Sequence, residues 1–75
     1  MKSLKELRND RYLSVRDLAE MAGVTPATVS YIENGKTIPR QKSIRKIATA
    51  LGVEPSEVRE FVDARAHWER ERPQE

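Results

Sequence analysis

Cysteine is absent from this chain, which excludes a disulfide and a thiolate metal site. There is a single histidine, His67, and the carboxylate of Asp63 does not make a metal site with it alone. Aromatic residues make up only 5% of the sequence, and no apolar run approaches the roughly 18 residues of a membrane-spanning helix. The N-terminus has no apolar stretch that resembles a signal peptide. We therefore expect a soluble cytoplasmic protein that needs no metal and no other cofactor.

Residues arranged for catalysis are absent as well. Ser14, Thr28 and Ser30 have no base close by in the sequence and no oxyanion loop, so none of them is expected to act as a nucleophile. There is also no glycine-rich loop of the kind that binds nucleotide phosphates. The chain is accordingly predicted not to be an enzyme.

Charged residues are abundant, at 35% of the chain, and they are unevenly distributed. Residues 1–50 carry ten lysines and arginines against five acidic residues, whereas residues 51–75 carry four against seven. A basic body favours a polyanionic partner such as a nucleic acid, and the acidic end is expected to point away from it. The alternative is that all these charges belong to ordinary solvated helix faces.

The 75 residues suffice for one domain with one small core, and turn signals divide them into five helical segments. Ser14 and Asp17 form a capping-box-like pair at the start of the second segment, and Gly23 is expected to end it in the left-handed conformation. Thr25 and Pro26 suit the N-cap and the first position of the third segment. The expected helices span about residues 2–9, 14–22, 26–33, 40–51 and 55–68, and Pro73 stops the last one at the latest.

Apolar side chains recur at helical spacing, so part of the core can be predicted as well. In the fifth segment, Val58, Phe61 and Val62 are expected to face inward. The clearest period lies in the fourth segment, at Ile44, Ile47, Ala48 and Leu51. The predicted fold class is all-α: a compact bundle of four to five short helices, whose C-terminal helix has room to extend.

Residues 14–34 contain two short helices that meet at a turn around Gly23, which is the spacing of a helix-turn-helix. In such motifs the N-terminal part of the second helix reaches base edges in the major groove of DNA. Small residues at that end permit a close approach, and a threonine there can hydrogen-bond a base or touch a thymine methyl group. The predicted base-reading residues are Pro26, Ala27, Thr28 and Tyr31.

Several short motifs follow one another at a characteristic spacing between about residues 4 and 58. They are Leu18-Ala19, Ala22-Gly23-Val24, residues 30–36 (Ser-Tyr-Ile-Glu-Asn-Gly-Lys), Ile38-Pro39 and residues 47–53. In this order the chain resembles the phage lambda repressor/Cro-like (XRE) family of helix-turn-helix regulators. The resemblance implies a prokaryotic or phage homodimer on a two-fold DNA operator. It also implies a structural ion pair between Arg8 and Glu33.

Polar and basic side chains around the motif are predicted to hold DNA phosphates. For those that follow the second helix of the motif, the alternative is that they belong to an ordinary solvated loop. The predicted set is Ser14, Arg16, Asn34, Lys36, Thr37 and Arg40. Val15 departs from the family pattern, because many relatives have a polar residue there that contacts a phosphate. That contact is expected to pass to Ser14 or Arg16. Gln41 stands where an apolar residue commonly packs in the family, so the resemblance does not predict the packing at this position.

The C-terminal residues lie beyond the region of resemblance. Residues 1–63 are predicted to form the DNA-binding domain, and residues 64–75 a charged helical extension. Phe61, Ala64 and Trp68 share one face of the last helix at i, i+3 and i+7. Two interpretations stay open: Trp68 folds back on the first helix, or these residues contact a second copy or another protein partner.

The sequence therefore predicts a sequence-specific regulator that binds double-stranded DNA. More specifically, it predicts a cofactor-free repressor that acts as a homodimer, in the cytoplasm and on the nucleoid when bound to DNA. The alternative is an antitoxin-type or other protein-interaction module that uses the same fold.

Overall fold

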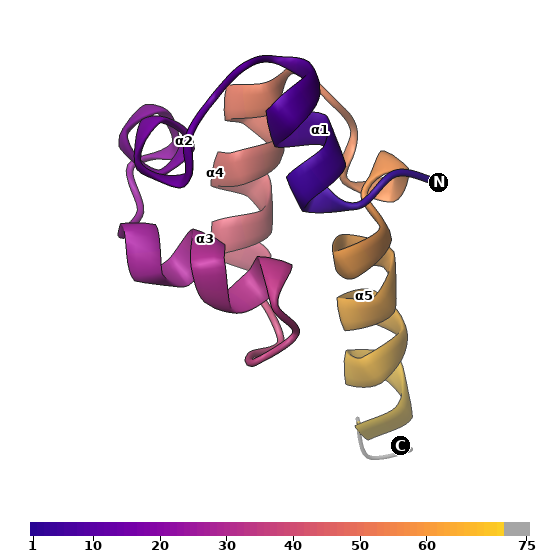
Figure 1. The fold of residues 1–75 in the computed structure, drawn as a ribbon. Coiled ribbons are helices and arrows are strands. Elements are labelled where there is room, and N and C mark those ends of the chain that lie inside the picture. The colour runs from indigo at the N-terminus through magenta and orange to yellow at the C-terminus, as the bar shows by residue number, and fades with distance from the viewer. Residues whose placement is uncertain (72–75) are drawn as a thin grey trace.

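Helices account for nearly all the secondary structure in the computed structural model, which describes residues 1–71 (Figure 1). Its elements are α1 (Leu4–Asp10), α2 (Val15–Ala22), α3 (Pro26–Glu33), α4 (Gln41–Leu51), the 3₁₀ turn η1 (Pro55–Glu57) and α5 (Arg59–Glu71). This part of the chain contains no strand, and the all-α prediction is confirmed. None of these helices is long and apolar enough to cross a membrane. Pro73, the predicted stop of the last helix, lies outside the described residues.

The first helix begins at Leu4 and not at residue 2, because Ser3 caps it. The Ser3 hydroxyl accepts a hydrogen bond from the Glu6 amide (3.1 Å), and the Glu6 carboxylate accepts one from the Ser3 amide (2.8 Å). The bond from the Ser3 amide lowers the pKa of the Glu6 carboxyl below its ordinary value. Ser-x-x-Glu is the usual capping-box pattern, so the sequence carries this signal although the predicted start overlooked it.

Capping also fixes the two helices of the predicted motif. Ser14 Oγ accepts a hydrogen bond from the Asp17 amide (2.9 Å), and Thr25 Oγ1 accepts one from the Thr28 amide (3.2 Å). Gly23 ends α2 with a φ of 73°, a left-handed conformation that strains residues with a Cβ but suits glycine. The predicted starts of α2 and α3 and the predicted end of α2 are therefore confirmed.

One hydrophobic core joins all the helices, with α4 running behind α1 and α3 (Figure 1). The second helix packs against both α3 and α4. The buried apolar residues are Leu4, Leu7, Leu18, Ala19, Ala22, Val29, Ile32, Ile44, Ile47, Ala48, Leu51, Val58, Phe61 and Ala64. All four residues of the period predicted in α4 are among them, so that prediction is confirmed.

The sequence predicts one continuous helix from about residue 55, and this prediction is wrong at Val58. Residues 55–57 form a 3₁₀ turn, Val58 is extended (φ −111°, ψ 121°), and α5 starts at Arg59. The cause is a long-range contact. Val58 pairs with Lys2 in an isolated parallel bridge, and the Arg59 amide donates to the Lys2 carbonyl (3.0 Å). Val58 is buried as expected, whereas Val62 is only half-buried.

The last helix runs without a break past residues 63 and 64, where the boundary between domain and extension is predicted. Ala64 belongs to the common core. The Glu60 carboxylate accepts a hydrogen bond from the Leu4 amide (2.8 Å), so the first half of α5 is tied to α1. The C-terminal end of α5 projects past the rest of the bundle (Figure 1).

Candidate nucleic-acid interface

The turn between α2 and α3 holds the two helices of the motif together. The Val24 amide donates to the Ala19 carbonyl (3.0 Å), and Val24 packs partly against the core. Ala19 is buried, as are Val29 and Ile32 on α3. Packing therefore uses the inner side of α3 and leaves its outer side to solvent.

The residues predicted to read bases lie on this outer side and in the first turn of α3. Pro26 and Ala27 are exposed, and Tyr31 is 50% exposed. Thr28 is half-buried, and its hydroxyl shares a hydrogen bond with the Thr25 hydroxyl (2.8 Å). A hydroxyl has one donor and two acceptor sites, so this bond leaves Thr28 able to contact a base edge. The helix thus presents small side chains at its N-terminal end and a tyrosine one turn later.

The residues predicted to hold phosphates flank this surface, and several have free polar atoms. Arg16, Lys36 and Arg40 are exposed, and none of them forms an ion pair within residues 1–71. The Ser14 hydroxyl accepts from the Asp17 amide, which leaves its own hydrogen free to donate to a phosphate oxygen. These side chains can therefore reach a DNA backbone without first breaking a bond in the free protein.

Asn34 differs from the rest of that set. Its side-chain amide donates to the Ser30 carbonyl (2.8 Å) and approaches the Ser30 hydroxyl (3.3 Å), which closes the C-terminal end of α3. A phosphate contact from Asn34 would require these bonds to open. Its phosphate contact stays a prediction, and its observed role is to cap α3.

A hollow of about 290 Å³ lies between α3 and its connection to α4. It is lined by Thr28, Tyr31, Ile32, Thr37, Ile38, Pro39, Arg40 and Ser43. The structure thus brings predicted base-reading residues together with predicted phosphate-binding ones. Sequence reasoning assigned no DNA contact to Ile38 or Ser43, because a sequence pattern shows neither exposure nor proximity across a loop.

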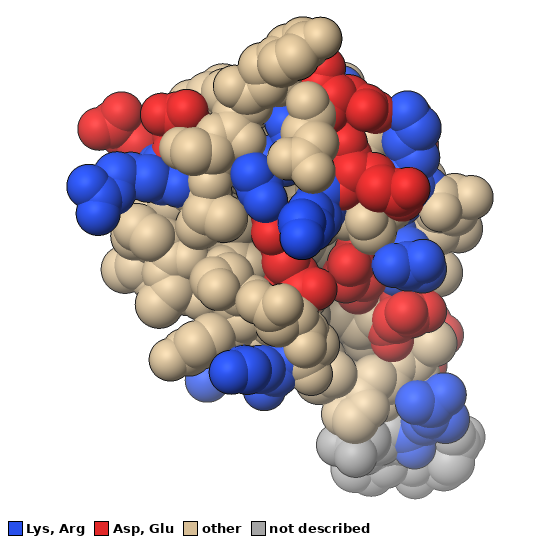
Figure 2. All heavy atoms as spheres, in the orientation of Figure 1, with Lys and Arg blue, Asp and Glu red and all other residues tan. Residues whose placement is uncertain are grey.

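The charges on the surface are unevenly distributed. In Figure 2 side chains of both signs lie over α1, α2 and α5, whereas those below α3 are lysines and arginines. Residues 34–53 contain five lysines and arginines and no acidic residue. This distribution favours an anionic partner on the side of α3 and its connection to α4.

In the part of the chain that the structure describes, His, Asp and Glu form no group of three or more that could hold a metal ion.

An ion pair fastens α3 to α1. Arg8 Nε donates to Glu33 Oε2 (2.7 Å) and Arg8 Nη2 to Glu33 Oε1 (3.1 Å), while Arg8 Nη1 donates to the Leu13 carbonyl (2.7 Å). The two side chains are only 10% and 6% exposed. The hydrogen bond with Glu33 raises the pKa of the Arg8 guanidinium above its ordinary value, so the guanidinium stays charged. The contact implied by the family resemblance is present and fixes the end of α3.

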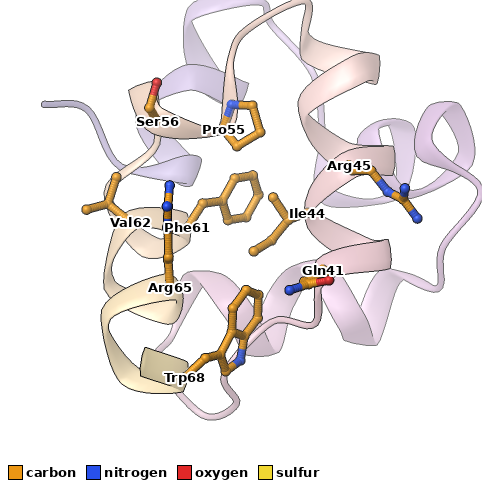
Figure 3. Close-up of a pocket in the computed structure, with 9 residues that line it drawn as sticks. All are labelled: Gln41, Ile44, Arg45, Pro55, Ser56, Phe61, Val62, Arg65 and Trp68. Carbon is orange, nitrogen blue, oxygen red and sulfur yellow. The ribbon is translucent and has the colours of Figure 1, made fainter. Parts of the chain in front are cut away.

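Trp68 lies at the edge of a groove of about 440 Å³ between α4, η1 and α5 (Figure 3). Its ring points toward Ile44 and Phe61, so it folds back within one chain, although onto α4 and not onto α1. Phe61 and Ala64 are buried in the core, so among the three predicted contacts Trp68 alone keeps surface for a second copy. Gln41, the other departure from the family pattern, is exposed on the rim of the groove.

Comparison with known protein sequences assigns the chain to a family. A family model described as helix-turn-helix matches residues 4–58. The chain belongs to the helix-turn-helix family of the lambda repressor type. The members with which it aligns are transcriptional regulators, which is a class of DNA-binding proteins and not of enzymes.

The similar curated proteins are longer than this chain. The uncharacterized HTH-type transcriptional regulator RghRB of Bacillus subtilis (strain 168) is 47% identical over 51 residues, or 67% of this chain and 37% of RghRB. The HTH-type transcriptional repressor RghR of the same organism is 45% identical over 51 residues, covering 67% of this chain and 38% of RghR. The uncharacterized regulator Rv0023 of Mycobacterium tuberculosis is 34% identical over 53 residues, 71% of this chain and 21% of its own length. The chain therefore spans well under half of each relative, and no solved structure matches it significantly.

Proposed function

We propose that this protein is a sequence-specific transcriptional repressor that binds double-stranded DNA as a homodimer on a two-fold operator. The observation that carries the proposal is α3. Its inner side is buried, its outer side presents small residues and a tyrosine, and it is flanked by cations that form no ion pair with the described residues. The name of RghR, a transcriptional repressor, supports repression as the outcome. On this proposal the protein acts in the cytoplasm and is nucleoid-associated when bound to DNA.

Docking divides the contacts into two groups. The first turn of α3 enters the major groove, where Ala27 and Thr28 face base edges and Tyr31 reaches a base or a phosphate through its hydroxyl. Lys36 and Arg40 hold the sugar–phosphate backbone and set the depth and angle of α3, but they carry no sequence information. The Arg8–Glu33 pair keeps α3 in position while these contacts form.

Dimerisation follows from how little one copy can read. A single first turn of α3 contacts few base pairs, and two copies related by a two-fold axis double that number. Their recognition helices then enter half-sites roughly 34 Å apart on one face of the duplex. The groove beside Trp68 supports a seam along α5, because Trp68 and Val62, which help to line it, are only half-buried in one copy. A second copy seated there would remove that apolar surface from water.

Selection of bound sites from random DNA tests the proposal most directly. We expect an inverted repeat with the half-site spacing given above. A gel-shift series on the selected site is expected to show binding that weakens steeply with salt, because each phosphate contact releases a counterion. Salt-sensitive binding to every DNA alike, with no enriched sequence, contradicts a sequence-specific regulator.

Two single variants separate base reading from backbone contact in the same assay. Thr28→Ala is expected to change the preference at one base step, because it removes a group that faces base edges. Lys36→Ala is expected to weaken binding to all sites by a similar factor. It should also reduce the slope of log affinity against log salt concentration by about 1, the value of one lost phosphate contact. An equal loss on every sequence for Thr28→Ala would count against direct readout by that residue.

The same groove also favours a second candidate function, that of a protein-interaction module of the antitoxin type. In that case an apolar segment of another protein, not a second copy, covers Trp68. Selective DNA binding by the pure protein favours the repressor. Binding that becomes selective only when a partner is added favours the module.

A further inference from the structure

Ile38 is an exposed aliphatic side chain in a region where its neighbours are predicted to touch DNA. It is 45% exposed, and it belongs neither to the buried core nor to the apolar residues packed against that core. The residue that follows, Pro39, is buried and anchors the connection between α3 and α4. Ile38 therefore stands on the outside of an anchored segment, and the core of the fold does not account for its apolar side chain.

The neighbours of Ile38 show what meets it when DNA binds. It lines the hollow beside α3 together with Thr28 and Tyr31 on one side and Thr37 and Arg40 on the other. No acidic residue lines this hollow, so an approaching polyanion is not repelled there. Ile38 thus lies between the residues that we propose for base reading and those that we propose for phosphate contact.

The chemistry of the major groove limits what an isoleucine can read at that position. Base edges there offer hydrogen-bond donors and acceptors, and their one apolar group is the C5-methyl of thymine. An aliphatic side chain cannot hydrogen-bond, so only this methyl group gives it sequence information. The deoxyribose is the other apolar surface within reach, but it is the same at every position.

We infer that Ile38 is a base-reading residue that contacts the methyl group of one thymine in each half-site. This inference rests on the proposed function and adds to it a specificity contact outside α3. The contact extends the short reading surface of one copy by a base pair next to those that Thr28 and Tyr31 face. A conservative change at Ile38 should therefore alter sequence preference as well as affinity.

Deoxyuridine scanning of the selected operator tests the inference. Each thymine is replaced in turn by deoxyuridine, which removes the methyl group and keeps every hydrogen bond. At one position per half-site, we expect the wild-type dissociation constant to rise about fourfold, the value of one methyl group removed from water. Ile38→Ala should bind the thymine and deoxyuridine forms of that position equally well, and Ile38→Val should retain part of the difference.

The remaining thymines provide an internal control. Ala27 and Thr28 also lie where they can touch methyl groups, so their thymines should keep the deoxyuridine effect in Ile38→Ala. Met21→Ala is the matched control variant, because Met21 is 55% exposed on α2 and does not line the hollow. Its scan should equal that of the wild type. Thermal melting should show that all variants fold, since neither side chain belongs to the core.

Three outcomes would overturn the inference in different ways. If Ile38→Ala weakens every DNA equally and all deoxyuridine effects persist, Ile38 contacts only the backbone. If the wild type selects an operator but no thymine couples to Ile38, the base contact is wrong while the proposed function stands. If the wild type selects no sequence, the proposed function fails and the inference fails with it.

Discussion

At the scale of single residues, Arg8 ties the C-terminal end of α3 to α1. It donates two hydrogen bonds to Glu33 and one to the Leu13 carbonyl, and both charged side chains are nearly buried. Arg8→Met strands the Glu33 carboxylate in a site closed to water. We expect the free energy of unfolding in urea to fall by about 3–5 kcal/mol.

The double variant Arg8→Met/Glu33→Leu is the control for that prediction. Because it removes both charges, it should recover a large part of the lost stability. If the double variant is as unstable as the single one, the cost comes from lost packing and not from a stranded charge. Sequence spacing alone gives no hint of this pair, since residues 25 positions apart show no periodic relation. Family resemblance supplied it, whereas the hydrogen bond between Thr25 and Thr28 came only from the structure.

At the scale of elements, the capping of α2 gives a prediction about pH. The Ser14 amide donates to the Asp17 carboxylate (3.1 Å), and this bond lowers the pKa of the Asp17 carboxyl below its ordinary value of 3.8. A carboxyl with a depressed native pKa stabilises the fold above its unfolded pKa and loses that effect as the pH falls through the native pKa. Asp17→Asn should therefore lower the melting temperature at pH 7 and have almost no effect well below pH 3.8.

Asp63→Asn is the matched control, because Asp63 is exposed within α5 and caps no helix. Its melting temperature should follow that of the wild type at both pH values. A deficit of Asp17→Asn that persists unchanged in acid would show that the carboxylate contributes through packing and not through its charge.

Helix boundaries were predictable where their cause is local. Ser14, Thr25 and Gly23 act within one turn of their own position, so the sequence alone locates both helices of the motif. The break at Val58 has a different origin, since its partner Lys2 is at the other end of the chain. Helical periodicity reflects local spacing only, so the sequence predicts one long helix there. The contact with Lys2 interrupts that helix at Val58.

At the scale of the whole molecule, one copy completes its hydrophobic core but leaves apolar surface exposed in the groove between α4 and α5. The core closes without help, because Phe61 and Ala64 are buried in a single chain. The sequence does not predict which helix Trp68 contacts, because its spacing from Phe61 and Ala64 shows only which face of α5 it occupies. The structure places its ring beside Ile44, on a surface that the described chain does not cover completely (Figure 3).

That groove makes the oligomeric state testable through Trp68, the one tryptophan of the chain. If a second copy covers the groove, the fluorescence emission of Trp68 should shift to shorter wavelength as protein concentration rises. Sedimentation should show a dimer over the same concentrations. Trp68→Ala should move the sedimentation profile toward monomer, because it removes apolar surface that the second copy would cover.

Tyr12→Ala is the control for this last prediction, because Tyr12 is an aromatic residue 95% exposed on the turn between α1 and α2, away from the groove. It should leave the sedimentation profile unchanged. An unchanged dimer in Trp68→Ala would place the seam on another face of the molecule. The predicted half-site spacing would then hold only if a dimer formed through that face also places the α3 helices of its two copies one turn of DNA apart. The spacing found by selection and the oligomeric state of Trp68→Ala therefore constrain each other.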